Sequence, residues 1–428
     1  MSSTTAYEPV ANFYAGKSIF ITGGTGFLGK VLIEKLLYSC PKLDKIYTLV
    51  REKKSQSPEK RLQNMIELPM FARLRKERPE DLRKIVPVVG DITEPDLGIK
   101  EEDQEVLLEK VNVVFHVAAT VLFNEPLRVS MDQNFEGTKR TLNISKKMKN
   151  LQAFVYVSTA YSNTTREEIK EVVYPPPALY DDVYAALEKH GDDEKEIKLI
   201  LNGQPNTYTF TKAPSIVMGS KTEPIEGWVD NWFGANGTMT MIGKGYIRVL
   251  LGKGSNILDM IPVDYVSNLV VVAAAKCKGS KEILVYNSCS STANPVTLES
   301  TCRYFIAETV NLKLNDIPYP TITFSKYQWL VKIIIFIIQT IPAFIMDCFQ
   351  LLMGKEPRYQ KLQAKLQRLQ NSQEYFTSNS WLIHSEQTQA LYASLSESDK
   401  SHFKFDPCDI VWSQYISVCY KGIKTYLF

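Results

Sequence analysis

The residues whose types and spacing best suit chemistry are a tyrosine and a lysine four positions apart. Tyr208 and Lys212 stand in Tyr-Thr-Phe-Thr-Lys, and on a helix this spacing puts both side chains on one face. A nearby ammonium lowers the pKa of a phenol from about 10 towards neutral pH, so that the phenol can donate a proton to a developing alkoxide. The same spacing also arises often by chance on a solvated helix, so the pair indicates a reductase site only in combination with other signals.

Two hydroxyl side chains supply one such signal. Ser158 and Thr159 stand in Val-Ser-Thr-Ala-Tyr, directly after a predicted buried strand at 154–157. Their hydroxyls are suited to bond the same carbonyl oxygen that the tyrosine protonates.

A glycine-rich turn near the N-terminus supplies a second signal. Gly23-x-x-Gly26-x-x-Gly29 follows a predicted strand at 18–22 and precedes an amphipathic helix predicted over 30–38. Glycines let backbone N–H groups approach a pyrophosphate, and the helix points its positive end at that charge. This context favours dinucleotide binding over a plain turn. The residues expected to contact the dinucleotide here are Thr22, Gly23, Thr25, Gly26, Phe27, Leu28 and Gly29.

The end of the second predicted strand, 45–50, indicates which dinucleotide is bound. Arg51 follows it, and there is no acid at the place where a ribose 2′-hydroxyl would be held. A guanidinium suits a 2′-phosphate, so the sequence predicts NADPH, although an exposed arginine here would be unremarkable by itself.

Two weaker signals come from polar side chains. Asp91 is placed to accept a hydrogen bond from an adenine amine, or simply to form a turn, and Ile92 beside it is expected to contact the cofactor. Asn134 is placed to orient the lysine through water, although an amide within a helix often makes only local bonds.

The strand predicted at 111–115 ends in small residues. Ala118 and Ala119 permit close approach of the cofactor, and the preceding His116 suits packing as well as function.

The elements that must position these residues alternate between strand and helix. With a further strand predicted at 85–89, the pattern predicts an α/β fold with a doubly wound parallel sheet of the Rossmann type. An apolar helix is predicted over 265–275, with Asp264 near its start as a cap. The charged segment 163–204 is expected to be a surface loop, a lid or a solvated helical excursion.

Composition excludes several other classes of protein. Lys plus Arg at 50 against Asp plus Glu at 47 gives a net charge of +3, which argues against nucleic acid as the main partner. The seven cysteines are scattered and include no C-x-x-C pair, which indicates reduced thiols and no zinc site.

The most apolar stretch, 329–346, is about long enough to cross a bilayer, but Lys332, Gln339 and Pro342 weaken that interpretation. A shallow helix on a membrane, or one buried against protein, explains it equally well. The expected domains are an NADP-binding Rossmann domain at 1–290, a connecting region at 291–354 and a smaller helical domain at 355–428.

These residues, in this order, resemble the extended short-chain dehydrogenase/reductase superfamily, and within it the alcohol-forming fatty acyl-CoA reductases. The matching motifs are Thr22-Gly-Gly-Thr-Gly-Phe-Leu-Gly29, Val157-Ser-Thr-Ala-Tyr161, Glu171-Val-Val-Tyr-Pro-Pro176, Tyr208-Thr-Phe-Thr-Lys212, Pro214-Ser-Ile-Val217, Glu223-Pro-Ile-Glu-Gly-Trp-Val-Asp-Asn231, Glu374-Tyr-Phe-Thr-Ser-Asn-Ser-Trp381 and Trp412-Ser-Gln-Tyr-Ile416.

The resemblance implies reduction of a long-chain fatty acyl-CoA to the fatty alcohol by two NADPH, with release of CoA. It makes Tyr208 the proton donor, Lys212 its tuner and a ribose contact, and Thr159 or Ser158 the partner of the oxyanion. It also implies contact with the cytosolic side of a peroxisomal or endoplasmic reticulum membrane. The sequence predicts no oligomeric state.

One departure from the family pattern concerns the segment after the lysine. Lys212 is followed at once by Ala213 and Pro214, whereas in the family the helix continues and a strand follows before an Arg-Pro-Ser turn. A helix end and a strand need roughly 15 to 20 residues, so the sequence indicates an internal deletion. The hydrophobic C-terminal membrane anchor of some relatives is also expected to be absent.

The departure leaves two alternatives open. One is a catalytically impaired NADP-binding relative or splice variant. The other is a sugar-nucleotide or steroid reductase of the same superfamily, which would leave the matching C-terminal motifs unexplained.

Overall fold

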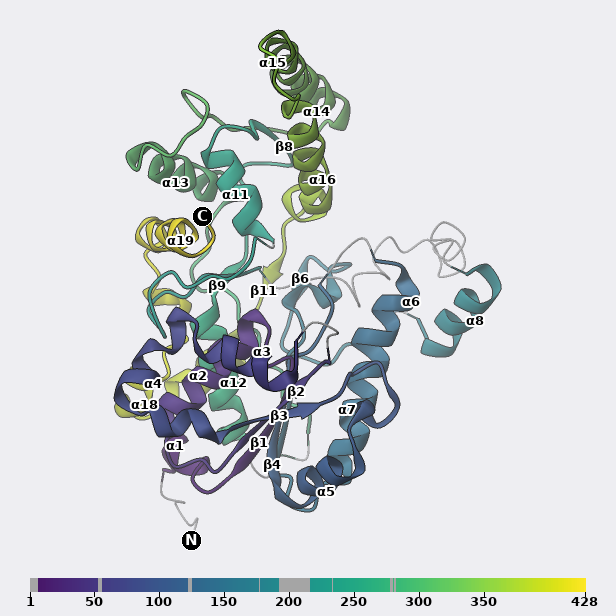
Figure 1. Cartoon of the computed structure of the whole chain (residues 1–428), viewed down its shortest axis with the longest axis vertical. Helices are drawn as coiled ribbons and strands as arrows, with labels where there is room; N and C mark the ends of the chain where they lie inside the picture. Colours follow the sequence, from purple (N-terminus) through teal and green to yellow (C-terminus); the bar gives the residue numbers. More distant parts are fainter. Residues whose placement is uncertain are drawn as a thin grey trace.

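The computed structural model describes residues 7–52, 56–121, 125–176, 178–191, 216–232, 234–277, 280 and 282–428. The N-terminal part forms one end of the long axis of the molecule, and the helices that follow residue 290 build much of the other end (Figure 1). The catalytic pair expected at Tyr208 and Lys212 lies outside the described residues.

A five-stranded parallel sheet forms the N-terminal part, in the order β3-β2-β1-β4-β5. Its strands are β1 (Ser18–Thr22), β2 (Ile46–Val50), β3 (Ile85–Val89), β4 (Val111–His116) and β5 (Ala153–Tyr156). All five occur at the places predicted from short apolar or β-branched runs, within a residue or two at each end. The predicted doubly wound Rossmann-type fold is therefore confirmed.

Helices cover both faces of this sheet, because alternate side chains of a strand point to opposite faces. Ile19 and Ile21 of β1 pack in the core that includes α2 (Phe27–Ser39) and α12 (Val263–Lys276). Phe20 between them packs in a second core that includes residues of α5 (Glu101–Lys110) and α7 (Gly137–Lys146). The sheet is buried between two helical layers.

Short helices lie in the segments that connect the strands of the N-terminal part, or next to those strands. They are α1 (Val10–Phe13), α3 (Pro58–Ile66), η1 (Pro69–Phe71), α4 (Ala72–Glu77), η2 (Pro79–Lys84), η3 (Pro95–Gly98), α6 (Leu127–Ser130), the π-helical η4 (Met131–Glu136), η5 (Ala160–Asn163) and α8 (Tyr180–His190).

The strands beyond β5 belong to separate two-stranded sheets. Strand β7 (Ile216–Met218) pairs with β9 (Met260–Pro262), β8 (Val249–Leu251) with β10 (Thr323–Ser325), and β6 (Glu168–Ile169) with β11 (Leu382–Ile383). Among the described residues, no strand pairs with the outer edge of β5. The chain between β5 and β7 contains the predicted deletion point, and residues 192–215 of it lie outside the described part.

The C-terminal part is mainly helical, as expected. Its helices are α11 (Ala235–Gly243), α13 (Leu298–Asn311), α14 (Gln328–Ile335), η6 (Phe336–Thr340), α15 (Ile341–Leu352), α16 (Tyr359–Ser378), α17 (Glu386–Ala393), α18 (Glu397–His402), η7 (Pro407–Asp409) and α19 (Trp412–Tyr426). One core is continuous from α1 and α2 to α19, so this part is packed onto the sheet domain.

One local expectation was wrong, and one was incomplete. Asp264 does not cap its own helix: its carboxylate accepts hydrogen bonds from the backbone N–H groups of residues 221–223, and Pro262 is the residue before α12. The described part of the segment 163–204 is not simply a solvated excursion. Within it Glu171 is buried and accepts hydrogen bonds from the N–H groups of Asn287, Gln387 and Thr388, which fastens this segment to the start of α17.

Candidate active site

The carboxyl ends of β1, β4 and β5 meet at one edge of the sheet, because these three parallel strands are neighbours. The glycine-rich turn follows β1, Ala118 and Ala119 follow β4, and Ser158 and Thr159 follow β5. The structure thus brings together the predicted cofactor turn and the predicted hydroxyls.

The glycine-rich turn requires glycine at two of its positions for different reasons. Gly23 has a φ of +73°, and a Cβ there would lie 2.7 Å from the backbone nitrogen of Ala118. A Cβ at Gly29 would lie 2.2 Å from the Gly23 carbonyl oxygen. The glycines therefore let β4 and the helix α2 close tightly around the turn.

Helix α2 begins immediately after this turn. Its N-cap is Gly26, no side chain caps its first N–H groups, and its first turn contains no acidic residue. A helix start of this kind suits an anion, because unpaired N–H groups and the helix dipole both favour negative charge. Among the residues expected to contact the dinucleotide, Thr22 ends β1, and the others lie in this turn or in the first turn of α2: Gly23, Thr25, Gly26, Phe27, Leu28 and Gly29. The chain therefore offers a fitting cradle for a dinucleotide pyrophosphate.

A chain of hydrogen bonds links the end of β1, next to the glycine-rich turn, to β4 and to the helix after it. Sequence reasoning did not identify this relay. The Ala118 N–H donates to Thr22 Oγ1 over 3.3 Å, and Thr22 Oγ1 lies 2.7 Å from His116 Nδ1. His116 Nε2 lies 3.0 Å from Thr138 Oγ1, and that hydroxyl donates to the Asn134 carbonyl oxygen.

The direction of this relay fixes the state of the imidazole. Because the Thr138 hydroxyl already donates to a carbonyl, it must accept from Nε2–H of His116, and Nδ1 then accepts from Thr22. Burial lowers the pKa of His116 to about 4, so the ring is neutral at pH 7. His116 is therefore a positioning residue that connects the end of β4 to the turn and to the helix of Asn134.

Asn134 lies in the π-helical turn η4 and is bonded to a loop. Its Oδ1 accepts from the Thr120 N–H at 2.7 Å, and its Nδ2 donates to the Thr120 carbonyl oxygen at 3.1 Å. These two bonds hold the segment that follows Ala118 and Ala119. The role of Asn134 towards Lys212 stays a prediction, because that lysine is outside the described residues.

Arg51 and Asp91 lie side by side beyond β2 and β3. Arg51 Nε is 3.4 Å from Asp91 Oδ2, and the arginine side chain remains 51% exposed. Asp91 Oδ1 accepts from the N–H and the hydroxyl of Thr93, so the alternative role in a turn is observed. Ile92 is buried in the sheet core. The contacts expected with adenine and with a 2′-phosphate stay predictions.

The motif Val157-Ser-Thr-Ala-Tyr161 follows β5, and its hydroxyl side chains become more buried along the sequence. Ser158 is exposed and Thr159 is half-buried, with its Oγ1 accepting from the Tyr161 N–H at 3.2 Å. Tyr161 is fully buried, and its hydroxyl donates to the Asp259 carbonyl oxygen at 3.3 Å. Burial raises the pKa of Tyr161 well above 10, so this phenol is structural.

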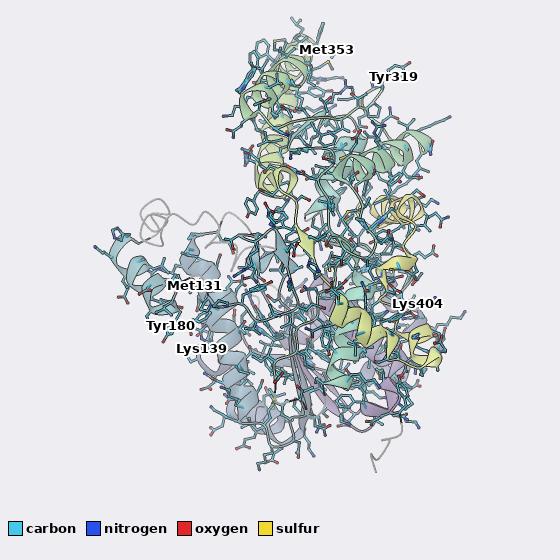
Figure 2. All side chains as sticks on the ribbon, turned by 180° about the vertical axis from the view of Figure 1, so that it is seen from behind. Met131, Lys139, Tyr180, Tyr319, Met353 and Lys404 are labelled. Atoms are coloured by element: carbon cyan, nitrogen blue, oxygen red, sulfur yellow. The ribbon has the colours of Figure 1, made fainter. Side chains whose placement is uncertain are left out.

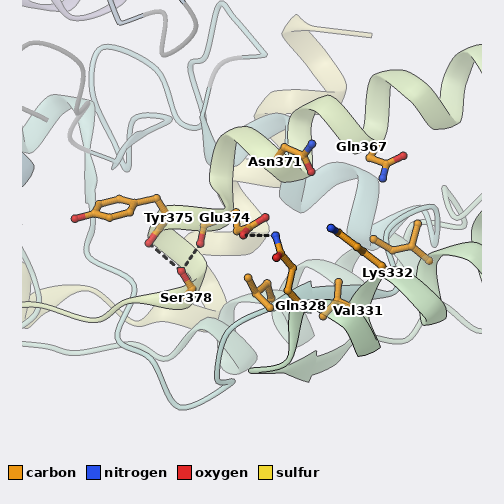
Figure 3. A pocket seen from close by; sticks show the side chains of 10 residues that line it. Gln328, Val331, Lys332, Gln367, Asn371, Glu374, Tyr375 and Ser378 are labelled. Atoms are coloured by element: carbon orange, nitrogen blue, oxygen red, sulfur yellow. Dashed lines mark hydrogen bonds between the residues drawn. The ribbon is translucent and has the colours of Figure 1, made fainter. Parts of the chain in front are cut away.

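Aromatic rings from the C-terminal part pack against that tyrosine. The centroid of Tyr161 lies 5.3 Å from Phe376 and 5.4 Å from Trp381, and Trp381 donates to the Thr164 carbonyl oxygen. Tyr375 lies 5.5 Å from Trp381 and also lines a cavity of about 550 Å³ between α14 and α16 (Figure 3). This cavity contains none of the predicted site residues. The aromatic cluster packs apolar side chains of the C-terminal part against Tyr161, two residues after Thr159.

Comparison with known proteins agrees with this arrangement. Two family models, both described as male sterility protein, match the chain: an NAD-binding model over residues 21–214 and 213–270, and a second model over residues 338–428. The two stretches of the first model meet at residues 213–214, which is the predicted deletion point.

Solved structures of low sequence identity share the fold. The terminal R domain from the myxalamid PKS-NRPS pathway has a TM-score of 0.62 at 20% identity, covering 96% of this chain and 92% of its own. The reductase domain of a nonribosomal peptide synthetase from Mycobacterium tuberculosis has a TM-score of 0.58 at 16% identity, covering 97% and 94%.

Sequence relatives cover nearly the whole chain. Fatty acyl-CoA reductase 1 of Xenopus laevis is 37% identical over 446 residues, and the human protein of that name is 36% identical; both matches cover 98% of this chain and 86% of the relative. The Drosophila melanogaster fatty acyl-CoA reductase wat is 32% identical with the same coverage. At 98% of 428 residues this chain fills about 419 of the 446 aligned positions, so about 27 have no counterpart in it. Identity and coverage of this extent show that the chain belongs to the fatty acyl-CoA reductase family.

Proposed function

We propose that this protein reduces a long-chain fatty acyl-CoA to the fatty alcohol, consuming two NADPH and releasing CoA. The observation that carries the proposal is the shared sheet edge, where the cofactor turn and the hydroxyl motif lie together on a chain that resembles fatty acyl-CoA reductases along nearly its full length.

The residues of the chain would act at the carbonyl oxygen in both reductions. Bound NADPH would supply a hydride each time. Thr159 or Ser158 donates a hydrogen bond to the oxygen as negative charge develops, and Tyr208 supplies its proton. Lys212 keeps the pKa of Tyr208 low and contacts the ribose. After the first reduction CoA leaves as the thiol, and the aldehyde is held for the second.

The cofactor and the cellular setting are part of the same proposal. An NAD(P)-binding domain is established by the family model, and Arg51 favours NADPH within that class. Contact with the cytosolic side of a peroxisomal or endoplasmic reticulum membrane is supported by the family resemblance and by one apolar helix.

A second candidate function is binding of NADP without turnover. The observation that favours it is the split in the family match, whose two pieces meet at residues 213–214. In the described part of the chain, no strand pairs with the outer edge of β5. Each buried backbone group left unpaired there would cost about 1 to 3 kcal/mol.

Oxidation of NADPH in the presence of palmitoyl-CoA separates the two functions. The reductase is expected to oxidise NADPH only when acyl-CoA is present, and Thr159→Val, which removes one hydroxyl at nearly constant volume, is expected to lower the rate about 10²-fold. Thr425→Val, on the exposed side of α19, is the matched control and should leave the rate unchanged. Folded protein that binds NADPH but never oxidises it would reject the reductase and support the second candidate.

A further inference from the structure

The segments α14, η6 and α15 form one continuous helix, Gln328–Leu352. It buries polar side chains and exposes apolar ones, whereas a helix on the surface of a soluble protein does the reverse. The side chains that it buries include Gln339, Asp347 and Gln350, which are 6%, 3% and 9% exposed. Its exposed side chains are nearly all large and apolar: Trp329, Ile333, Phe336, Ile337, Ile338, Ile341, Phe344, Ile345, Met346, Phe349, Leu351 and Leu352. We call this set the apolar face.

The apolar face is concentrated at one end of the molecule. Of the 31 exposed large hydrophobic side chains in the described part of the chain, 14 lie between residues 327 and 353. Helices α14 and α15 stand at an extreme of the long axis, and Met353 and the 88% exposed Tyr319 lie at that same end (Figures 1 and 2). A monomeric soluble protein rarely exposes an apolar patch of this kind, so another medium or molecule covers it.

The buried polar side chains bind the helix to α16. Gln363 Nε2 donates to Gln339 Oε1 over 3.1 Å, and Asp347 accepts from the N–H groups of residues 358–360 over 2.8 to 2.9 Å. At the other end, Gln328 Nε2 donates to Glu374 Oε1 over 3.3 Å (Figure 3). These pairings show that α16 runs antiparallel alongside the whole helix.

This attachment excludes a membrane-spanning orientation. The exposed side of α16 carries Lys361, Lys365 and Arg368. If the apolar helix crossed a bilayer, it would take α16 and these charges into the hydrocarbon, which is strongly unfavourable. A helix that lies in the plane of the membrane keeps α16 on the aqueous side and exposes only its own apolar face to lipid.

The charge around the apolar face also fits a lipid surface. Residues 326–368 contain seven Lys and Arg against two acids, a net charge of +5, although the whole chain carries only +3. Lys326 and Lys355 flank the helix, and Tyr327 and Trp329 lie at its start, where aromatic rings favour the interface between lipid and water. Basic residues near a membrane attract anionic lipids.

We propose that the helix Gln328–Leu352 lies in the plane of one leaflet of an anionic bilayer, with its apolar face in the lipid and α16 on the aqueous side. The inference deepens the proposed membrane contact. It does not depend on turnover, because it rests on the polarity of this helix, its attachment to α16 and the charge around it.

Flotation of the full-length protein with vesicles of phosphatidylcholine and phosphatidylserine tests binding. Wild-type protein should float, and Phe336→Gln/Phe344→Gln/Phe349→Gln should stay in solution. The matched control is Val106→Gln/Ile283→Gln/Val411→Gln, three exposed hydrophobic residues outside the apolar face, which should float like wild type. Lys326→Gln/Lys355→Gln should weaken binding to the anionic vesicles about 30-fold.

Labelling distinguishes an in-plane helix from a spanning one. In a Cys277→Ser/Cys348→Ser/Cys408→Ser background, which removes the three cysteines that are not buried, Lys326→Cys and Lys355→Cys mark the two ends of the helix. A membrane-impermeant maleimide is added outside the vesicles. Both cysteines should react equally fast; protection of one end would mean that the helix spans and would overturn the proposal.

Two further outcomes would also overturn it. One is equal flotation of wild type and the triple apolar-face variant. The other is wild-type protein that does not bind vesicles but forms dimers, when the triple variant forms none. This result would show that a second copy of the chain covers the apolar face. Oxidation of NADPH with a short, soluble acyl-CoA, measured on the same samples, should not differ between wild type and variant, so a failure of the reductase proposal is recognised separately.

Discussion

His116→Gln should remove the loss of stability in acid that this one imidazole causes. In the wild type the imidazole is buried, accepts from Thr22 and donates to Thr138. Protonation would turn Nδ1 into a donor facing a hydroxyl whose proton already points towards it, and would place a charge in the core. The fold therefore opposes protonation, whereas glutamine keeps a polar side chain that does not titrate.

The size of the effect follows from the shift in pKa. Burial lowers the pKa of His116 from 6.5 to about 4. At 1.36 kcal/mol per pKa unit, this corresponds to about 3 kcal/mol. Between these two values the unfolded chain binds more protons than the folded one. The contribution of His116 to the free energy of unfolding is thus fully present above pH 6.5 and is lost as the pH falls through 4.

A second buried group has the opposite sign and would mask this effect in the wild type. Burial raises the pKa of Asp259 from 3.8 to about 6, although the N–H groups of Ser290 and Ser291 donate to it. Its contribution is fully present below pH 3.8 and is lost as the pH rises through 6. The shift in the pKa of Asp259 again corresponds to about 3 kcal/mol. The contributions of His116 and Asp259 to the free energy of unfolding therefore nearly cancel between pH 4 and 6.

Urea unfolding separates the contributions of the two groups. It is measured for wild type, His116→Gln and Asp259→Asn at pH values from 4 to 7.5. The stability of wild type minus that of His116→Gln should increase by about 3 kcal/mol from pH 4 to pH 7. The same difference for Asp259→Asn should decrease by a similar amount. A difference between wild type and His116→Gln that does not change with pH would refute the neutral relay.

Three further predictions concern the reaction. Arg51→Ala should reduce the preference for NADPH over NADH by about 10- to 100-fold in measured dissociation constants, because a charge-assisted bond to the 2′-phosphate is lost; equal affinities in the wild type would contradict the assignment. Tyr208→Phe should lower the rate by about 10²- to 10⁴-fold and leave NADPH affinity unchanged, since the phenol donates a proton but holds little of the cofactor; unchanged turnover would place the site elsewhere. Inserting between Lys212 and Ala213 the segment that the Xenopus laevis relative has there should raise both the melting temperature and the rate, and equal melting and equal rates would show that the segment was never needed.

Local patterns in the sequence were sufficient to predict the sheet and the cofactor turn. The strands β1 to β5 are short apolar runs, most of them rich in Val and Ile, and a buried parallel strand needs little else to be recognised. The turn was predictable because glycines between a strand and a helix have a direct geometric reason, which the close approach of Gly23 to Ala118 bears out.

Features that depend on distant parts of the chain were not predictable in the same way. The role of His116 depends on Thr22 and Thr138, which lie on other elements, so the sequence left packing and function equally open. Asp264 looked like a helix cap, but its partners come from a loop more than 40 residues earlier. An apolar run does not reveal which of its side chains are buried, so the inverted polarity of residues 328–352 required the structure.

The most direct test of the proposed function is the stoichiometry of the reaction with palmitoyl-CoA. In a closed reaction we expect two NADPH to be oxidised for each CoA released, with one hexadecanol formed and no aldehyde accumulating. Folded protein that binds NADPH but releases no CoA, or that stops after one NADPH with free hexadecanal, would contradict the proposal.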